Sequence, residues 1–419
     1  MTTASEEHVV IIGAGIIGIA CAHYIQKLGH KVTVIDKGTV AGACSHGNCG
    51  QILPSHILPL NDPAAIKTAF LSLFDREAAF MVKPRLSTPF MKWMWNFTRH
   101  CTESHKTKAA ASLFAILHSS YHEYEALMQG DTFPCEWKKS GSLYLYKNEA
   151  EFQKFEQVNA WCSEHHDITA EQISGDQLTS LDPALTDNLA GGYFYPDDAC
   201  LRPDQLAREW VNRLKAGGVN FMEHCTFERL EAKNGHITTI ETSQGVLETD
   251  HVVLAAGAMS ETLAKQFQSS IPMEPGKGYA VSLERPQSCP EVSLILPEQN
   301  IAVTSFSDQL RLGSIMEFVG YDHSIPEYRM QQLIERVRPY LKSDLHEPVI
   351  EKWYGWRPMT WDSLPIIGRS AAHKNAYFAT GHNMIGMMSA PATGKLITEL
   401  LSGQSTHIDA TPFSPARFN

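Results

Sequence analysis

The chain lacks several patterns that would place it in a well-defined class. Charged residues make up only 19% of its 419 residues, and no basic tract occurs. With a formal net charge of -11 the chain repels phosphate backbones, so nucleic-acid binding is not expected. Nine cysteines are present without a CxxC pair. This pattern favours free thiols in a reducing compartment over a disulfide framework.

Other missing motifs narrow the chemistry. The sequence has neither HExxH nor clustered cysteine and histidine, so no metal site is predicted. It has no GxSxG, which argues against a serine hydrolase. No basic region precedes the first apolar run, Val9 to Ile25, and glycines interrupt that run. We therefore expect neither a signal peptide nor a membrane span, and we predict a cytoplasmic protein.

The segment from His8 to Lys37 carries the strongest positive signal. Val9 to Ile12 is a short apolar run typical of a buried parallel strand. Ile17 to Leu28 is a predicted helix that ends at Gly29, and Lys31 to Ile35 is a second predicted strand. The order of strand, glycine turn, helix, strand and acid predicts a dinucleotide-binding unit.

Each part of this unit has a physical task. Gly13 permits the tight turn, Gly15 lets the backbone approach a pyrophosphate, and Gly18 lets helix and strand pack closely. The N–H groups of Ile16 and Ile17 lie at the predicted helix N-terminus, which attracts phosphate. Asp36, followed by Lys37, lies where a ribose-binding acid is expected. An acid there argues against a 2′-phosphate but leaves NAD and FAD both open.

The length of the chain suggests two domains. Segments with α/β character lie at its start, middle and end, and mainly antiparallel or helical segments lie between them. We predict an α/β fold in which a Rossmann-like nucleotide-binding domain contains an inserted α+β substrate domain on a mainly antiparallel sheet. The predicted limits are 1–62, 195–265 and 345–419 for the nucleotide-binding domain, and 63–194 and 266–344 for the substrate domain.

Seven segments in order resemble the glycine oxidase / D-amino-acid oxidase superfamily, and most of all its branch of bacterial D-amino-acid dehydrogenase small subunits. They are the first βαβ unit, "GNCGQILP", "GGYFYPDDACLRP", "HVVLAAGAMS", "PGKGYAVSLE", "GWRPMTWDSLPIIG" and "YFATGHNMIGMMSAPATGKLITELLSG". The resemblance implies a GR2-type fold that binds FAD rather than NAD. It also implies oxidation of an amino acid by hydride transfer from Cα to flavin N5, giving an imino acid that hydrolyses to a keto acid.

The same resemblance assigns further contacts to the flavin. A loop after the second strand, a middle segment, a second glycine turn and a turn before the last helix are implied to contact it. The residues are Ser45, Asn48, Gly50, Gln51 and Ile52; Thr226 and Phe227; Ala256 and Gly257; and Gly381, His382, Asn383, Met384, Ile385, Gly386 and Met387. No cysteine follows Cys289, so we predict FAD bound without a covalent link.

Three residues are candidates for substrate binding and catalysis. Arg357 in "GWRPM" matches the family's arginine that holds the substrate carboxylate; the alternative is a buried ion pair with an acid such as Asp362. Tyr279 in "GKGYA" matches a position that lines the substrate side, or it is a core aromatic. His56 lies just past the flavin loop and faces the substrate, or it is a surface or core histidine.

Several alternatives stay open at this point. The preferred substrates are D-amino acids, with cyclic ones such as proline or hydroxyproline among the candidates. A glycine or sarcosine oxidase that uses oxygen is the second enzyme hypothesis, and a non-catalytic flavoprotein subunit is the third. The electron acceptor is a quinone or oxygen, and a homo-oligomer is one possible state. The aromatic segment from Phe90 to Cys101 either touches the inner membrane face or packs on the substrate domain.

Overall fold

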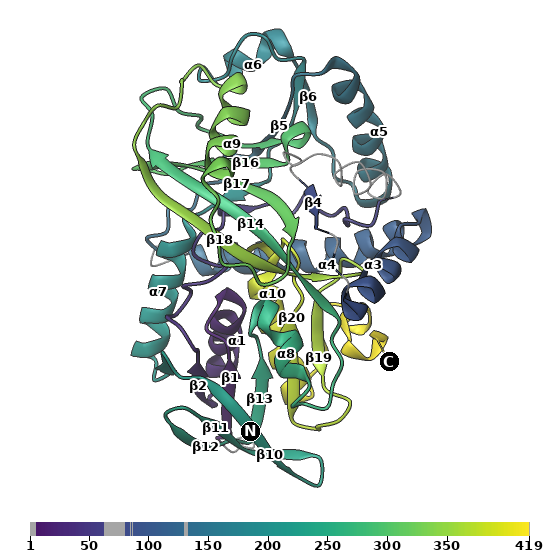
Figure 1. The fold of residues 1–419 in the computed structure, drawn as a ribbon, viewed down its shortest axis with the longest axis vertical. Coiled ribbons are helices and arrows are strands. Elements are labelled where there is room, and N and C mark those ends of the chain that lie inside the picture. Colours follow the sequence, from purple (N-terminus) through teal and green to yellow (C-terminus); the bar gives the residue numbers. More distant parts are fainter. Residues whose placement is uncertain (1–5, 63–79, 84, 86, 130–132, 419) are drawn as a thin grey trace.

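The computed structural model describes residues 6–62, 80–83, 85, 87–129 and 133–418. Two large sheets organise these residues: a six-stranded sheet and a nine-stranded sheet. In Figure 1 the six-stranded sheet lies in the lower half of the molecule and the nine-stranded sheet in the upper half. The predicted combination of a parallel α/β sheet with a mainly antiparallel one is confirmed.

The six-stranded sheet has the order β19-β20-β13-β1-β2-β9. Its parallel strands are β1 (His8–Ile12), β2 (Lys31–Ile35), β9 (Asn220–Met222), β13 (His251–Leu254) and β20 (Ala376–Thr380), and β19 (Ile366–Arg369) is antiparallel at one edge. Residues 9–12 of β1 are all buried, as the unbroken apolar run predicts for a strand covered on both faces. The strands predicted at Val9 and Lys31 are therefore confirmed.

Two helices cover one face of this sheet in close contact. They are α1 (Ile16–Lys27), which was predicted from Ile17 to Leu28, and α10 (Gly386–Ser402). A Cβ on Gly394 of α10 would lie 2.5 Å from the Ala20 carbonyl oxygen of α1, so glycine is what lets the two helices approach. Helix α7 (Pro203–Ala216) also contacts α1, through a buried stripe that includes Trp210.

A small three-stranded sheet projects at the lower end of Figure 1. It consists of β10 (Phe227–Lys233), β11 (His236–Thr242) and β12 (Gly245–Glu248). Asn234 and Gly235, between β10 and β11, both have positive φ, 54° and 76°. This is the backbone that a two-residue type I′ hairpin requires, and asparagine and glycine adopt it at low cost.

The nine-stranded sheet follows the order β18-β14-β17-β16-β15-β5-β7-β6, with β4 (Phe80–Val82) beside β17. Its strands are β14 (Met273–Glu284), β15 (Ser293–Leu296), β16 (Ile301–Ser305), β17 (Gln309–Phe318), β18 (Val349–Thr360), β5 (Ser142–Tyr146), β6 (Glu171–Ser174) and β7 (Gly191–Tyr195). The domain limits predicted above stay a prediction. Strand β18 lies in the range 345–419, which was predicted for the nucleotide-binding domain. It pairs with β14, in the range predicted for the substrate domain, from Met273–Thr360 to Leu283–Val349.

Between Asp62 and Leu127, the described residues leave out 63–79, 84 and 86. The described part contains β4 and the helices α3 (Thr88–His100) and α4 (Glu103–Met128). Helix α4 packs on α10, where the Tyr124 hydroxyl donates to the Met387 carbonyl oxygen at 2.7 Å. Helix α9 (Glu327–Val337) begins directly after Pro326. Two further helices, α5 (Glu149–His166) and α6 (Gly175–Leu181), were not predicted.

The segment Ala43 to Leu60 contains one short strand. This strand, β3 (Gln51–Ile52), pairs with β8 (Ala199–Cys200) and ties the loop to the segment before α7. Among the described residues, no helix is long and apolar enough to cross a membrane.

Candidate active site

A cavity of about 620 Å³ lies where the two large sheets meet. Its floor includes the residues that follow the carboxyl ends of β1, β2 and β13 and the end of β20. Its other wall comes from β14, β17 and β18 of the antiparallel sheet. Open α/β sheets bind ligands outside the carboxyl ends of their parallel strands, so this cavity is where a nucleotide is expected.

The glycine turn after β1 has the geometry that a pyrophosphate site needs. Gly13 has φ +111°, and a Cβ there would lie 2.5 Å from the Ala255 carbonyl oxygen. A Cβ on Gly18 would lie 1.9 Å from the Gly13 carbonyl oxygen, so Gly18 serves packing and does not line the cavity. Gly15 lines the cavity, and its nearest obstacle is the Ser45 Oγ at 3.5 Å from a built Cβ. The space over Gly15 is therefore open to a ligand.

The N-terminus of α1 has no acidic residue in its first turn, and its cap, Gly15, offers no side chain. Ser45 accepts a hydrogen bond from the Ile16 N–H at 2.9 Å. The positive end of the helix dipole therefore faces the cavity without a carboxylate to neutralise it, which suits a phosphate.

Asp36 lies at the end of β2 and lines the same cavity. Its Oδ2 accepts from the Ala14 N–H and its Oδ1 from the Gly38 N–H, both at 2.8 Å. Each carboxylate oxygen has more than one acceptor site, so both can still take a hydroxyl donor. Asp36 thus braces the glycine turn and remains able to accept from a ribose.

The loop from Ala43 to Gln51 is held from behind by Arg311, a residue that the sequence analysis missed. Arg311 is 2% exposed and donates to the carbonyl oxygens of His46 and Asn48 at 3.0 and 2.9 Å. Asn48 in turn accepts from the Gly50 N–H at 2.7 Å through its side-chain oxygen. Arg311 lies in the stretch "LRLG", which contains no recognisable motif. Nothing in that stretch indicates that the side chain reaches the loop at His46 and Asn48, more than 260 residues earlier in the chain.

The turn before α10 is buried and internally bonded. Asn383, with φ 49°, accepts from the Thr360 N–H at 2.8 Å and so ties the turn to the end of β18. His382 is 2% exposed and contacts the Thr393 hydroxyl at 3.0 Å. Burial lowers the pKa of His382 to about 3, so its imidazole is neutral at pH 7. Like α1, α10 has no acid in its first turn.

The structure divides the predicted flavin contacts into two groups. Most of them line the cavity: Gly13, Gly15, Ile16, Ile17, Asp36, Lys37, Ser45, Asn48, Gln51, Thr226, Phe227, Ala256, Gly257, His382, Asn383, Met384, Gly386 and Met387. Five do not line it: Gly18, Gly50, Ile52, Gly381 and Ile385. Gly50, for example, packs on the backbone of Leu201, whose carbonyl oxygen would lie 1.9 Å from a Cβ.

Arg357 brings a cation to the opposite wall. Its Nη1 donates to the Ile315 carbonyl oxygen at 2.8 Å and its Nη2 to that of Ser314 at 3.4 Å. Both carbonyls belong to a bulge in β17, where Ser314 and Ile315 have φ of 131° and 49°. A guanidinium has five N–H donors, so three remain for a ligand. Burial lowers the pKa of Arg357, and no carboxylate among the described residues forms an ion pair with it.

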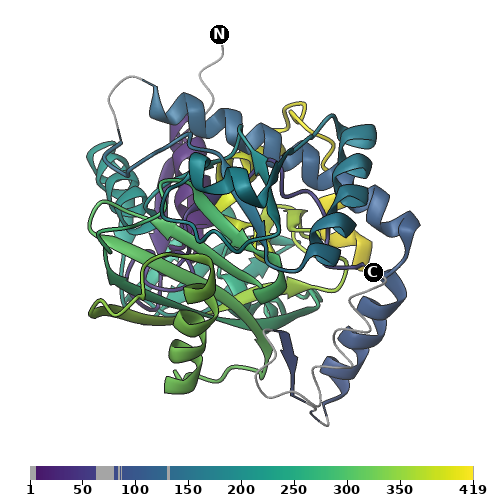
Figure 2. The same cartoon turned by 90° about the horizontal axis from the view of Figure 1, so that it is seen from above.

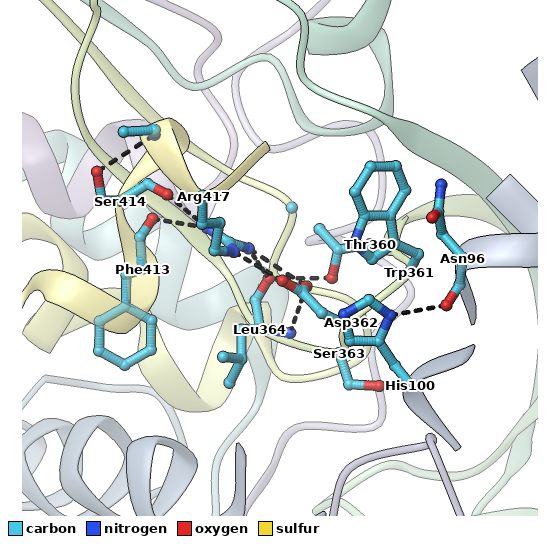
Figure 3. Close-up of polar contacts among 12 residues, drawn as sticks. Asn96, His100, Thr360, Trp361, Asp362, Ser363, Leu364, Phe413, Ser414 and Arg417 are labelled. Carbon is cyan, nitrogen blue, oxygen red and sulfur yellow. Dashed lines mark hydrogen bonds and ion pairs between the residues drawn. The ribbon is translucent and has the colours of Figure 1, made fainter. Parts of the chain in front are cut away.

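The alternative partner for Arg357, Asp362, is engaged elsewhere. Asp362 pairs with Arg417, whose Nε donates to its Oδ2 at 2.7 Å. Figure 3 shows Arg417 also reaching the carbonyl oxygens of Phe413 and Leu364, so this ion pair fastens the C-terminal segment to the turn after β18. The ion-pair alternative that named Asp362 is therefore wrong.

Tyr279 lines the cavity, and its hydroxyl bonds to a buried carboxylate. It donates to Glu317 Oε2 at 2.7 Å, and Glu317 pairs with Arg329 inside the protein. Tyr279 is 1% exposed, and burial raises its pKa. The Glu317 carboxylate thus accepts the hydrogen bond that the Tyr279 hydroxyl donates, and a catalytic role for Tyr279 stays a prediction.

His56 lines the cavity beside Tyr144 of β5, a residue that the sequence analysis did not single out. The His56 Nδ1 lies 3.3 Å from the Tyr144 hydroxyl oxygen. Burial lowers the pKa of His56, which keeps its ring neutral at pH 7. Trp353 and Trp356 of β18 also line the cavity, and the sequence analysis missed both.

Three cysteines, Cys44, Cys49 and Cys225, line the cavity as well. The Cys44 thiol donates to the Trp356 carbonyl oxygen at 2.8 Å. Burial raises the pKa of Cys44 and of Cys49 to about 11, so both of these thiols are protonated at pH 7. Because the thiolate is the reactive form, neither is poised for redox or nucleophilic chemistry. Among the residues described, no group of three or more metal-ligating side chains is present.

These features fit FAD. An open glycine turn, a helix N-terminus without an acid in its first turn and an acid at the end of β2 form one end of the cavity. On the opposite wall lies Arg357, whose described hydrogen bonds go to carbonyl groups. This arrangement defines a dinucleotide-dependent oxidoreductase with a second binding place for an anionic substrate.

Comparison with known proteins gives the family. Residues 8–400 match the family model DAO, described as FAD dependent oxidoreductase. The chain belongs to this family, and FAD is its cofactor.

Its relatives and structural neighbours agree. "D-amino acid dehydrogenase" of Neisseria meningitidis serogroup A / serotype 4A (strain DSM 15465 / Z2491) is 30% identical over 98% of this chain and 99% of that protein. The protein of the same name from Vibrio atlanticus (strain LGP32) is 29% identical, with the same coverage of both chains. The fold matches glycine oxidase from Geobacillus kaustophilus with a TM-score of 0.80 at 19% identity, covering 98% of this chain and 99% of that one.

Proposed function

We propose that the protein is an FAD-dependent dehydrogenase that oxidatively deaminates amino acids of D configuration. The observation that carries the proposal is Arg357, a half-buried cation at the cavity wall whose described partners are two carbonyl oxygens. The names of its full-length relatives support the substrate class. A substrate carboxylate that enters this cavity loses its hydration and needs a fixed positive partner.

The residues of the chain divide the work. When bound, FAD supplies the hydride acceptor for the substrate Cα–H. The turn at Gly13 and Gly15, the N-terminus of α1 and Asp36 hold the dinucleotide. Arg357 grips the substrate carboxylate in two parallel hydrogen bonds and so fixes the orientation of Cα.

His56 has the position and charge state of a proton acceptor. Hydride departure requires a neutral amine, so the ammonium group of the substrate must first lose a proton. In the tautomer that donates its Nδ1–H to the Tyr144 oxygen, the Nε2 lone pair of His56 is free to take that proton. We assign this role to His56, and we assign no proton transfer to Tyr279.

The test is an anaerobic bleaching screen of the FAD-loaded protein. D-amino acids, including D-proline and D-alanine, are mixed with the protein beside their L-enantiomers, glycine and sarcosine, and the flavin absorption near 450 nm is followed. Bleaching by D-amino acids in preference to the others is expected. Bleaching by glycine or sarcosine alone would show that these amines, and not D-amino acids, are the substrates. No bleaching by any of them would indicate a non-catalytic flavoprotein.

The electron acceptor is proposed to be a quinone rather than oxygen. The support comes from the word dehydrogenase in the names of the relatives and from the outer surface of α3. Oxygen consumption is compared with reduction of a soluble quinone at equal substrate turnover. Faster quinone reduction is expected, and equal or faster oxygen consumption would make the protein an oxidase.

We also propose that α3 contacts an anionic membrane surface. Phe90, Trp93 and Phe97 face the protein core, whereas Met91 and Trp95 are 60% and 64% exposed. In Figure 2 this helix lies at the edge of the molecule. The exposed Lys92 and Arg99 give the same surface a positive charge for lipid head groups.

Vesicles of phosphatidylglycerol and phosphatidylcholine test the membrane contact by co-sedimentation. The wild-type protein is expected to pellet with them, and a Trp95→Ser variant to remain in the supernatant. A matched control is Val246→Ser, which alters an equally exposed apolar residue on β12. Equal sedimentation of all three proteins would contradict the role of α3. The oligomeric state stays a prediction.

A further inference from the structure

Asp198 is a carboxylate buried at the edge of the candidate site. It lies in the turn between β7 and β8 and is 0% exposed. In the part of the chain that the structure describes, no lysine, arginine or histidine forms an ion pair with it. Burial raises its pKa to about 7. An acid in such a place is costly to keep, so its hydrogen bonds call for an explanation.

All side-chain bonds of Asp198 go to two serines. Its Oδ2 accepts from the Ser55 hydroxyl at 2.7 Å and from the Ser142 hydroxyl. Its Oδ1 accepts from the Ser55 backbone N–H at 3.3 Å. The Asp198 backbone adds a further link, because its carbonyl oxygen accepts from the Gly141 N–H at 3.0 Å. The carboxylate therefore joins the loop after β3 to the start of β5.

Each serine lies next to a residue of the cavity wall. Ser55 directly precedes His56, and Ser142 lies two residues before Tyr144 on β5. Residues two apart on a strand share one face, so Ser142 and Tyr144 face the same side. The His56–Tyr144 contact at 3.3 Å spans the same two segments that Asp198 joins. A shift of either segment would change that contact.

We propose that Asp198 is a positioning residue: by holding Ser55 and Ser142 to one carboxylate, it fixes His56 and Tyr144 as a pair on the substrate side of the cavity. The role of the pair toward substrate rests on the proposed function. Asp198 does not line the cavity, so it acts only through these neighbours.

The first test is Asp198→Asn in the FAD-loaded protein. The amide keeps the size of the side chain but presents an N–H group where the carboxylate accepts one, so at least one of the three bonds is lost. We expect kcat to fall about tenfold, because small misplacements of reacting groups have effects of this order or larger. FAD content should be unchanged. Asp197→Asn is the matched control, since Asp197 is the adjacent acid and is exposed.

A double-mutant cycle separates positioning from general structural support. In a His56→Gln background, Asp198→Asn is expected to lower kcat less than about twofold, because the group it positions is already gone. The same fold-loss in both backgrounds would overturn the proposal. If Asp198→Asn does not fold, Ser142→Ala removes one of the three bonds and is put through the same cycle with the same criterion.

A binding readout keeps this proposal distinct from the proposed function. Benzoate, a carboxylate that cannot be oxidised at Cα, is titrated against the FAD-loaded proteins and the flavin spectrum is followed. Asp198→Asn is expected to raise the benzoate Kd about threefold or more, and Asp197→Asn to leave it unchanged. If no amino acid bleaches the wild-type flavin, the proposed function fails, yet this titration still decides on Asp198. An unchanged benzoate Kd in Asp198→Asn would overturn the positioning role.

Discussion

Arg357 is the residue whose removal is expected to affect turnover most. Arg357→Met should lower kcat/KM for an amino acid on the order of 10²-fold, about 3 kcal/mol, because both affinity and alignment of the carboxylate are lost. Arg357→Lys should recover only part, since an ammonium cannot form the planar fork. Steady-state kinetics on each variant measures both effects.

Two controls decide whether Arg357 acts on the substrate. The variant should keep FAD, because its carbonyl partners lie on β17 rather than in the glycine turn. An amine without a carboxylate should be turned over, if slowly, at the same rate by variant and wild type. Loss of FAD, or an equal loss with that amine, would show that Arg357 is structural.

Asp36 has two tasks in the structure, and its removal should affect both. Asp36→Ala leaves the Ala14 and Gly38 N–H groups without their partner and removes a candidate ribose acceptor. We expect FAD to bind more weakly by roughly 1.5–3 kcal/mol. Titration of the apoprotein, followed by flavin fluorescence, measures the affinity. At saturating FAD the hydride step should be close to wild type, and an unchanged FAD affinity would exclude Asp36 as a cofactor contact.

The buried His382 should make the free energy of unfolding depend on pH. Its folded-state pKa is about 3 against an ordinary 6.5, so below pH 6.5 the unfolded chain binds a proton that the folded protein does not. The free energy of unfolding should therefore be highest above pH 6.5 and decrease as the pH falls toward 3. The share of this decrease that is due to His382 is at most about 5 kcal/mol. Denaturant titrations at several pH values should show a shallower fall for His382→Gln, and parallel curves would contradict the burial argument.

At the scale of elements, two glycines near the turn between β1 and α1 have different roles: Gly18 allows close packing, and Gly15 leaves space for a ligand. Gly18→Ala places a Cβ 1.9 Å from a backbone oxygen, so it should lower the Tm of the apoprotein and abolish FAD binding. Gly15→Ala meets only the Ser45 hydroxyl at 3.5 Å. It should leave the Tm of the apoprotein unchanged while weakening FAD binding, because the Cβ occupies the space over the turn. Equal effects of both variants on apoprotein Tm would contradict this division.

The same elements show what the sequence can predict. The unit β1–α1–β2 is local: its glycine turn, strand lengths and acid all follow from neighbouring residues, and each was predicted close to its observed limits. The opposite wall is not local. Arg311 reaches the loop at His46, and Tyr144 reaches His56, only because sheet pairing joins residues far apart in the chain. The bulge at Ser314 and Ile315 was likewise invisible, since neither residue type favours positive φ.

At the scale of the whole molecule, the site exists only where the two sheets meet. The parallel sheet contributes the nucleotide end through Gly15 and Asp36, and the antiparallel sheet contributes the substrate end through Arg357 and Tyr144. Asp198 and Arg311 lie outside the cavity lining and link the loops that cross between the sheets. The residues that position the site are thus buried polar groups at the junction, a class that motif analysis does not detect.

The mode of cofactor attachment is the last property that the whole cavity determines. Among the described residues, Cys44, Cys49 and Cys225 line it, and a covalent flavin link through sulfur would need one of them as a thiolate. Burial raises the pKa of Cys44 and of Cys49 to about 11, so at pH 7 on the order of one thiol in 10⁴ is ionised. The FAD should therefore be held without a covalent bond.

Precipitation with trichloroacetic acid tests this attachment. It should leave the yellow colour in the supernatant, both for the wild-type protein and for a Cys44→Ser, Cys49→Ser double variant. A yellow wild-type pellet that becomes colourless in the double variant would show that one of these thiols carries the flavin. A yellow pellet in both proteins would move the link to another side chain. In either case a buried side chain of the cavity would be more reactive toward the flavin than its burial predicts.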